Sequence, residues 1–326
     1  MLVLDAPSLA AALPMDKAIA ATMHGFRSNF GENAFDSDEI GHDLVDFRAK
    51  QEQFRALGLR LVTLATQNPA GEPPLVRALV VAVDRSSNEI VATLDGPSLT
   101  AIAAGARSGL ATDLLAEATS SVVALLGPRD ISLAQLAAIT SVRAISHVSI
   151  HGSSPSESNA TLAAAKAMAN AAYEVRIAST PAEAVADADI VCVATTSSTP
   201  LFCDDELKPG VHINAFGSRT PTRREVPSET VCKSIVTVDT RPGAMVEAGD
   251  LLIPMEEGLI GHDHIHADLA DLLHGRVVGR TSPGQTTLFK SVGVSAQDLM
   301  IAELALTRAR SLHLGHRLDF DDIHHR

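Results

Sequence analysis

The sequence predicts an α/β protein in which a doubly wound parallel sheet is inserted into an α+β domain. The chain has 326 residues, a length that suits two domains. From Ser121 onward, short apolar runs alternate with helical patterns, an order typical of a parallel sheet. Between Leu59 and Asp95, three β-branched runs follow one another with only turns between them, so they are expected to pair antiparallel.

The first domain begins with helical patterns over Ser8–Leu13 and Met15–Phe30, and a polar stretch without clear periodicity follows. Turn-forming residues then separate three predicted strands: Arg60–Thr66, Val76–Val83 and Ile90–Leu94. A helix rich in Ala and Gly is expected over Ser98–Ala116. The C-terminal helix, Ala296–Ser311, is expected to pack back on this domain, which would comprise residues 1–118 and 295–326.

The inserted domain, residues 119–294, contains the alternating strands and helices. Its predicted strands are Val122–Leu126, Val148–Ile150, Ile190–Ala194, Val211–Ala215 and Ile235–Asp239. Helical patterns lie between them, notably Asn159–Ala172. The sequence Thr180-Pro-Ala-Glu183 is a capping box with Pro at the first helical position, so it opens another helix.

Composition excludes several function classes. The chain carries 39 Asp and Glu against 26 Lys and Arg, and it has one Tyr and no Trp, so neither phosphate backbones nor stacked bases suit it. Without a run of 18 apolar residues or a signal peptide, no membrane association is expected. The three cysteines show no paired pattern, which indicates a cytoplasmic protein.

Several segments between about residues 57 and 310 together resemble the ornithine cyclodeaminase/μ-crystallin family. They are Leu94–Thr100, Ser108–Ala116, Ala194–Leu201, His212–Pro221, Glu247–Leu251, Gly279–Ser282 and Thr287–Gly293. The resemblance implies a homodimer with a Rossmann domain that binds NAD(H) or NADP(H). It further implies hydride exchange at the α-carbon of a small amino or imino acid.

The dinucleotide loop should follow the strand Val122–Leu126. Compared with the family pattern G-x-G-x-x-A/G, Gly127 fits, Arg129 replaces the second Gly, and Ser132 takes the small third place. A side chain at the second place obstructs the close approach of a pyrophosphate, although an Arg can instead pair with phosphate. Both interpretations stay open: a loop that still binds the dinucleotide, and a loop that has lost it.

After the second strand of this domain, no acidic residue comes before Glu157 to bind the ribose hydroxyls of NAD. The small hydroxyl residues Ser153, Ser154 and Ser156 suit a 2′-phosphate better, so NADP is slightly favoured. The alternative is that Ser154-Pro-Ser only caps the next helix.

The resemblance places the nicotinamide between two further segments. Thr195 and Thr196 follow a buried strand and align with the family's nicotinamide-side loop, and Ser291, Val292 and Gly293 align with a ring contact. For both segments an ordinary turn is the alternative, and Lys290, just before the second, can be purely structural.

The substrate side departs from the family pattern. Arg60 stands where members have a Lys, and it can clamp a carboxylate although it is a poor proton donor at neutral pH. The family's carboxylate-binding Arg and the Thr beside it fall on Ala103 and Ala104. Arg107, one turn later, is the candidate replacement, and a solvated helix Arg is the alternative.

Arg219 stands where cyclodeaminases carry an Asp that serves as base for the amine. Because an Arg cannot accept a proton from the substrate, this position favours an NAD(P)H-dependent reductase of a small imino acid or cyclic ketimine. Two alternatives remain: a cyclodeaminase-type lyase that uses bound NAD+ and another base, and a catalytically silent ligand-binding protein. The losses at Ala103, Ala104 and Arg129 favour the latter.

The sequence Gly261-His-Asp-His-Ile-His266 invites a metal interpretation, but HxHxH places its ligands on one face only in an extended segment. We expect this segment to start a helix running to Leu273, which scatters the three imidazoles. No metal site is therefore predicted.

Overall fold

The computed structural model describes residues 1–28, 35–39, 44–49, 57–66, 75–84, 87, 89–127, 129–169 and 172–318. The chain divides into two compact units, Met1–Ala103 with Ser295–Arg326, and Ala104–Val294. The division falls inside helix α3 (Gly96–Leu115), whereas the sequence placed the boundary behind that helix. No helix in the described part is both long and apolar enough to cross a bilayer.

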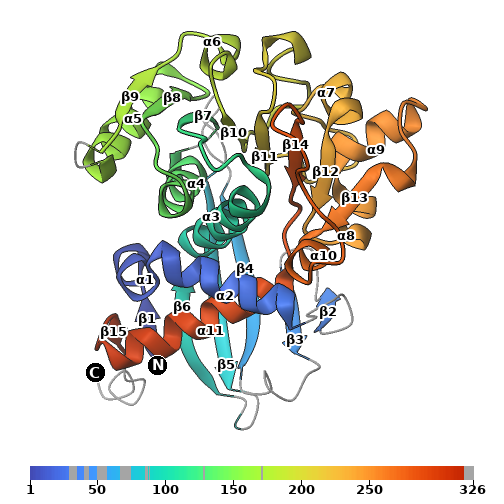
Figure 1. Ribbon diagram of the computed structural model, residues 1–326. Coiled ribbons are helices and arrows are strands. Elements are labelled where there is room, and N and C mark those ends of the chain that lie inside the picture. Colours follow the sequence, from blue (N-terminus) through green and yellow to red (C-terminus); the bar gives the residue numbers. More distant parts are fainter. Residues whose placement is uncertain are drawn as a thin grey trace. The chain divides into compact units, whose positions relative to one another are not determined.

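The second unit is built on an eight-stranded sheet in which every pairing is parallel. Its order is β13-β12-β14-β11-β10-β7-β8-β9 (Figure 1). The strands are β7 (Val122–Leu126), β8 (His147–His151), β9 (Glu174–Ile177), β10 (Ile190–Val193), β11 (His212–Ala215), β12 (Ile235–Val238), β13 (Ile265–Asp268) and β14 (Thr287–Lys290). From β9 the chain returns to β10, on the other side of β7, so the order reverses between β7 and β10. This confirms the predicted doubly wound sheet.

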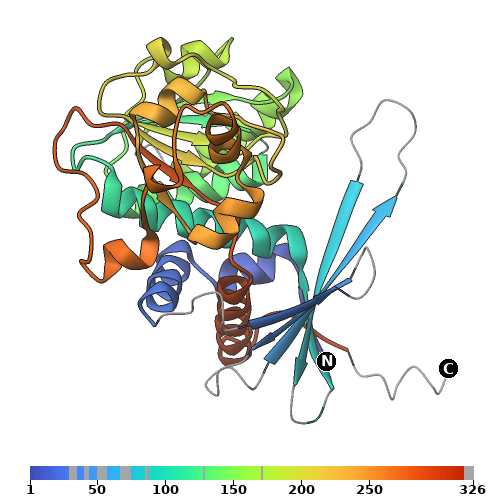
Figure 2. The same cartoon turned by 90° about the vertical axis from the view of Figure 1, so that its right-hand side faces the viewer.

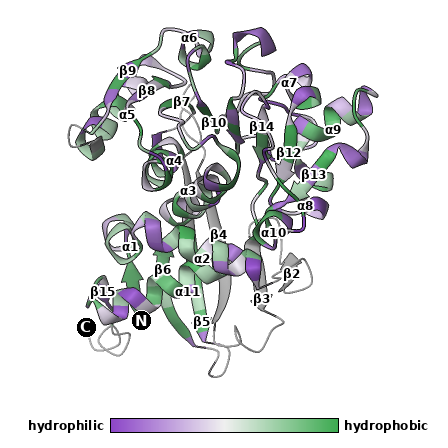
Figure 3. Ribbon diagram, viewed as in Figure 1, coloured by the Kyte–Doolittle hydropathy of each residue, from purple (hydrophilic) through white to green (hydrophobic). Residues whose placement is uncertain are grey.

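Helices cover both faces of this sheet, because alternate residues of each strand point to opposite sides. Val123 and Leu125 pack with Leu136 of α4 (Arg129–Val142), on the face that α5 (Pro155–Ala169) also covers. Ala124 and Leu126 belong to the opposite core, with α6 (Pro181–Val185), α7 (Ser228–Lys233), α8 (Arg241–Glu247) and α9 (Gly249–Glu256). Strands buried on both faces are rich in apolar residues, and β7 and β10 consist of them entirely (Figure 3).

The first unit contains a seven-stranded sheet in the order β15-β1-β6-β5-β4-β3-β2. The strands are β1 (Leu2–Leu4), β2 (Phe35–Glu39), β3 (Leu44–Ala49), β4 (Leu57–Thr66), β5 (Leu75–Asp84), β6 (Ile90–Asp95) and β15 (His316–Arg317). The antiparallel pairing of β4, β5 and β6 is confirmed. The C-terminal helix α11 (Ser295–Ser311) packs against α1 (Ala6–Ala12), α2 (Met15–Arg27), β3 and β4, as expected (Figure 2).

The sequence analysis missed strands in two places, and its expectation for the histidine segment was wrong. The stretch before residue 57 contains strands β1, β2 and β3, although β1 has only three residues and β2 reads Phe-Asp-Ser-Asp-Glu, which carries no apolar alternation. The four-residue strands β9 and β14 were not predicted. After a short 3-10 turn, residues 265–268 form β13, and the helix α10 (Leu269–Leu273) starts only behind it.

Candidate functional site

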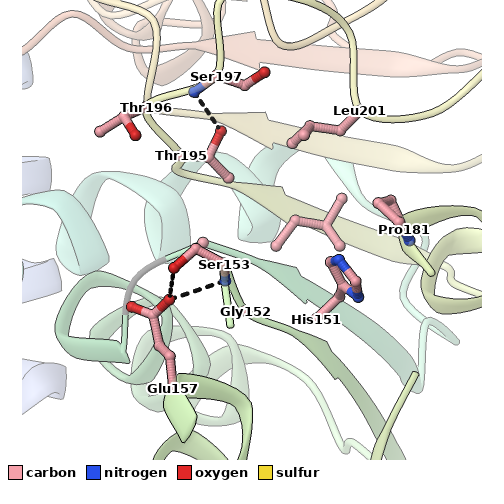
Figure 4. A pocket seen from close by; sticks show the side chains of 11 residues that line it. His151, Gly152, Ser153, Glu157, Pro181, Thr195, Thr196, Ser197 and Leu201 are labelled. Atoms are coloured by element: carbon pink, nitrogen blue, oxygen red, sulfur yellow. Dashed lines mark hydrogen bonds between the residues drawn. The ribbon is translucent and has the colours of Figure 1, made fainter. Parts of the chain in front are cut away.

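A cavity of about 270 Å³ opens at the carboxyl ends of β7, β8 and β10. The residues that line it come mainly from the loops after these strands: Leu126, Gly127, His151, Gly152, Ser153, Glu157, Pro181, Thr195, Thr196, Ser197 and Leu201 (Figure 4). The strand order reverses at this point, which is where doubly wound sheets bind ligands. The cavity is therefore the candidate dinucleotide site.

The turn after β7 requires a glycine. Gly127 has φ +141°, and a Cβ at this position would lie 2.6 Å from the carbonyl oxygen of Ala194. The turn leads the backbone tightly past β10 toward α4, whose first residue is Arg129. The N-terminus of α4 thus comes two residues after Gly127, which lines the cavity, a geometry that suits a phosphate group.

The two substituted positions of the glycine loop differ in their surroundings. The Arg129 side chain is about half exposed, and its Nε lies 3.3 Å from Oδ1 of Asp130. Ser132 is buried in the first turn of α4, and among the described residues its hydroxyl has no hydrogen-bond partner. Gly127, the unsatisfied Ser132 hydroxyl and the helix terminus fit a dinucleotide phosphate, while Arg129 is exposed enough to move toward one.

The loop after β8 contains the predicted serines and a carboxylate that the sequence did not single out. Glu157, in the first turn of α5, accepts hydrogen bonds from the backbone nitrogen of Ser153 at 2.9 Å and from the Ser153 hydroxyl. Ser154 caps α5, since its Oγ accepts from the Glu157 nitrogen at 3.2 Å. Ser153 and Glu157 line the cavity, whereas Ser154 serves the helix.

Thr195 and Thr196 line the cavity in the loop after β10. The buried carboxylate of Glu225 holds this loop, because its Oε1 lies 2.5 Å from both the backbone nitrogen and the hydroxyl of Thr195. Its Oε2 accepts from the nitrogen of Ser218 at 2.8 Å, next to Arg219. One side chain therefore joins the cavity wall to the loop that carries Arg219.

A buried ion pair lies next to Glu225 and contacts its backbone. Lys290 and Asp250 are fully buried, with Nζ and Oδ2 2.8 Å apart, and Lys290 also donates to the Ser218 carbonyl at 2.5 Å. Asp250 accepts from the backbone nitrogen of Glu225 at 2.6 Å. Burial raises the pKa of Glu225, and the charge of Asp250 raises it further. Lys290 thus has a structural role within this network.

The turn Ser291–Gly293 is held by the buried carboxylate of Asp239, which follows β12. Its Oδ2 accepts from the Ser291 hydroxyl at 2.8 Å, the Val292 nitrogen at 3.0 Å and the Gly293 nitrogen at 2.8 Å. Burial raises the pKa of Asp239, and the positive charge of Arg107 opposes this shift. The turn that was predicted to contact nicotinamide is therefore rigidly held.

Two of the three predicted arginines meet beside this turn. A Cβ on Gly293 would lie 3.6 Å from Nη2 of Arg219 and 3.9 Å from Nη2 of Arg107. Arg107 is 2% exposed, with its guanidinium 5.3 Å from the centre of the Phe216 ring, so it is not a solvated helix residue. Arg60 lies in β4, opposite Val81, and its side chain is outside the described part of the chain.

Two imidazoles of the histidine-rich segment lie within hydrogen-bond distance of backbone carbonyl oxygens. Nε2 of His264 lies 2.8 Å from the Val231 carbonyl, and Nε2 of His266 lies 2.8 Å from the Val278 carbonyl. No group of three or more His, Cys, Asp or Glu suited to a metal occurs among the residues that the structure describes.

Comparison with known proteins identifies the family. The family model described as ornithine cyclodeaminase/mu-crystallin family matches residues 15–312. The chain belongs to this family. It is 34% identical over 275 residues to a Δ1-pyrroline-2-carboxylate reductase from Bacillus cereus, covering 82% of each chain. It is 32% identical over 255 residues to the mouse ketimine reductase mu-crystallin, covering 76% of this chain and 75% of the other.

A solved member of the family has the same fold over nearly the whole chain. It is the Thermococcus litoralis Δ1-pyrroline-2-carboxylate reductase in complex with NADH and L-proline. The two share 29% identity with a TM-score of 0.85, over 98% of this chain and 100% of the other.

Three carboxylates of the present chain were not identified from its sequence as parts of the site: Glu157, Glu225 and Asp239. Glu225 and Asp239 lie 30 and 52 residues from Thr195 and Ser291, which they hold, so no local pattern connects them. Glu157 follows the strand too late to match the usual position of a ribose-binding acid. Glu157 comes four residues after Ser153 across the start of a helix, and this spacing could have predicted a contact between the two side chains.

Proposed function

We propose that this chain is an NAD(P)H-dependent reductase of a small imino acid or cyclic ketimine. The observation that carries the proposal is the cavity at the point where the strand order reverses, which is lined by the Gly127 turn and by Thr195 and Thr196. Relatives named as reductases of this substrate class cover most of the chain. When bound, the coenzyme would supply the hydride to the imine carbon.

The chain's own residues would bind and orient the two reactants. Gly127 and the N-terminus of α4 suit the pyrophosphate, with Arg129 able to pair with it. Thr195, Thr196 and the turn Ser291–Gly293 would border the nicotinamide. Of the arginines, Arg107 and Arg219 approach that turn, where their positive charges suit a substrate carboxylate.

Reduction suits this set of residues better than cyclodeamination. By the family resemblance, Arg219 stands where cyclodeaminases carry a basic Asp, and a guanidinium stays protonated, so it cannot take a proton from an amine. The lyase would need another base. A catalytically silent role would leave the coenzyme cavity intact but produce no turnover with any imine, so the same assay separates all three functions.

The test is a binding titration followed by turnover. NADH and NADPH are titrated against purified protein while nicotinamide fluorescence is recorded, and then Δ1-pyrroline-2-carboxylate with reduced coenzyme is compared with ornithine and NAD+. We expect saturable binding and oxidation of the reduced coenzyme by the imine alone. Ammonia release from ornithine would favour the lyase, and binding without turnover would favour the silent protein.

We also propose that the protein is a cytoplasmic homodimer, on the family resemblance and on cysteines that form no disulfide among the described residues. Light scattering coupled to size exclusion is expected to give twice the chain mass, and a monomer at assay concentrations would contradict it.

The serine-rich sequence Ser153–Ser156 predicted NADP(H), but the contacts of Glu157 do not support this preference.

A further inference from the structure

We propose that Glu157 makes this chain prefer NADH to NADPH, by placing a carboxylate where the adenosine ribose of the coenzyme binds. The inference rests on the proposed function, because it concerns the coenzyme of the same cavity. In NAD-binding sheets of this type, an acidic group near the end of the second strand binds the ribose hydroxyls. Here the second strand is β8, and the group comes from the helix that follows it.

The fold brings the Glu157 carboxylate back to the end of β8. Oε2 accepts from the Ser153 nitrogen at 2.9 Å and from the Ser153 hydroxyl, two residues after His151 ends the strand (Figure 4). Both residues line the cavity, and Glu157 is only partly exposed. The carboxylate is therefore held at the cavity wall instead of extending into solvent.

Three donors that this loop could offer a 2′-phosphate are already used within the protein. The hydroxyl and nitrogen of Ser153 donate to Glu157, and the Gly152 nitrogen donates to Oγ of Ser158 at 3.0 Å. The Ser154 hydroxyl oxygen accepts from the Glu157 nitrogen and so lies at the start of α5. A phosphate ester would have to break these bonds before it could be held.

Charge acts in the same direction. Among the described residues that line the cavity, Glu157 is the only one with a formally charged side chain, and none is Lys or Arg. A 2′-phosphate carries about −1.5 to −2 charge at neutral pH, so the carboxylate would repel it. A ribose 2′-hydroxyl can instead donate to the carboxylate. The site thus combines an attraction for NADH with a repulsion of NADPH.

The test compares the two coenzymes in wild-type protein and in E157Q. We expect wild type to favour NADH by at least about tenfold, both in kcat/KM with Δ1-pyrroline-2-carboxylate and in Kd. E157Q keeps an acceptor for Ser153 but removes the charge, so the preference should fall at least about tenfold. The double variant with Ser153→Arg should move it further toward NADPH. Glu174→Gln, on the exposed side of β9, removes an equal charge and should leave the ratio unchanged.

The outcomes separate this inference from the function on which it rests. Saturable binding of both coenzymes with equal or stronger binding of NADPH by wild type would overturn the role of Glu157 and leave the reductase standing. The role of Glu157 is likewise overturned if E157Q, folded by circular dichroism, keeps the wild-type ratio. If neither coenzyme binds saturably, both proposals fail. The wild-type ratio needs no variant, so the test does not depend on how E157Q folds.

Discussion

Asp239 holds three successive residues with a single carboxylate oxygen. Its other oxygen accepts from the nitrogen of Thr240 at 2.9 Å, so both oxygens of this buried group accept hydrogen bonds. Such a group is costly to bury and costly to replace, because each donor left behind lies in a medium without water. The conformation of the Ser291–Gly293 turn therefore depends on one side chain.

Asp239→Asn is expected to lower the free energy of unfolding by about 2–4 kcal/mol, because the amide nitrogen must face at least one N–H donor. The turn should loosen, and kcat with the imine should fall at least about tenfold. Urea denaturation and initial rates measure the two effects. Asp187→Asn, at an exposed position, serves as the matched control. A D239N protein with wild-type kcat would show that the turn does not contribute to catalysis.

His212 is a buried group whose protonation opposes folding. Its Nδ1 lies 2.9 Å from Oγ1 of Thr287, and burial, together with the charge of Arg280, lowers its pKa to about 3. The unfolded chain takes up this proton near pH 6.5, before the native protein does. The stability that the neutral imidazole contributes is therefore complete above pH 6.5 and is lost progressively as the pH falls toward 3.

His212→Leu removes this titration. Between pH 7 and pH 4.5, wild type should lose about 2–3 kcal/mol more stability than the variant. The reason is that from pH 6.5 down to pH 4.5 the unfolded chain binds the proton on His212 while the folded protein does not. Urea denaturation of both proteins at the two pH values measures the difference. An equal loss in wild type and variant would show that His212 titrates normally in the folded protein.

Among the elements, the loop after β10 and the loop that carries Arg219 are joined by Glu225. The second loop is further fixed by the Lys290 contact to Ser218 and by the Ser218 hydroxyl, which donates to the Arg223 carbonyl. Gly217 has no room for a side chain, because its Cβ would lie 2.2 Å from the Thr195 carbonyl oxygen. The wall of the cavity and the position of Arg219 are thus set together.

Glu225→Gln should disturb both loops at once. Glutamine offers one acceptor oxygen where the carboxylate offered two, so either Thr195 or Ser218 keeps an unsatisfied N–H. We expect about 1–3 kcal/mol of lost stability and about tenfold weaker coenzyme binding, measured by denaturation and by fluorescence titration. Glu229→Gln, on the exposed side of α7, should change neither. Lost stability with unchanged coenzyme affinity would limit Glu225 to a role in folding.

The predictable elements were those whose own residues decide their structure. β7 and β10 are continuous apolar runs, β12 is apolar except for Thr237, and the capping box at Thr180 starts α6 as expected, its Oγ1 accepting from the Glu183 nitrogen. β14 was missed because it ends in Lys290, whose burial depends on Asp250, 40 residues away in the chain. The same limit applied to the site: the loops were located from the sequence, but the carboxylates that hold them were not.

For the molecule as a whole, membership of the ornithine cyclodeaminase/mu-crystallin family leaves the reaction to be decided by particular residues. From the sequence, the glycine loop with Arg129 left two interpretations open, a retained and a lost coenzyme site. The structure retains the Gly127 turn, the cavity and the helix terminus, so the exchange at residue 129 changes one contact and not the architecture. The proposed function therefore depends above all on this cavity binding a reduced nicotinamide coenzyme that serves reduction of an imino acid.

The most direct test is a titration of the wild-type protein with NADH, followed by addition of Δ1-pyrroline-2-carboxylate, with Gly127→Ala in parallel. We expect saturable binding and coenzyme oxidation by wild type. We expect neither for G127A, in which the added methyl group would collide with the Ala194 carbonyl. Folded wild-type protein that binds neither NADH nor NADPH, or binds one and never oxidises it with this or related imines, would contradict the proposed function.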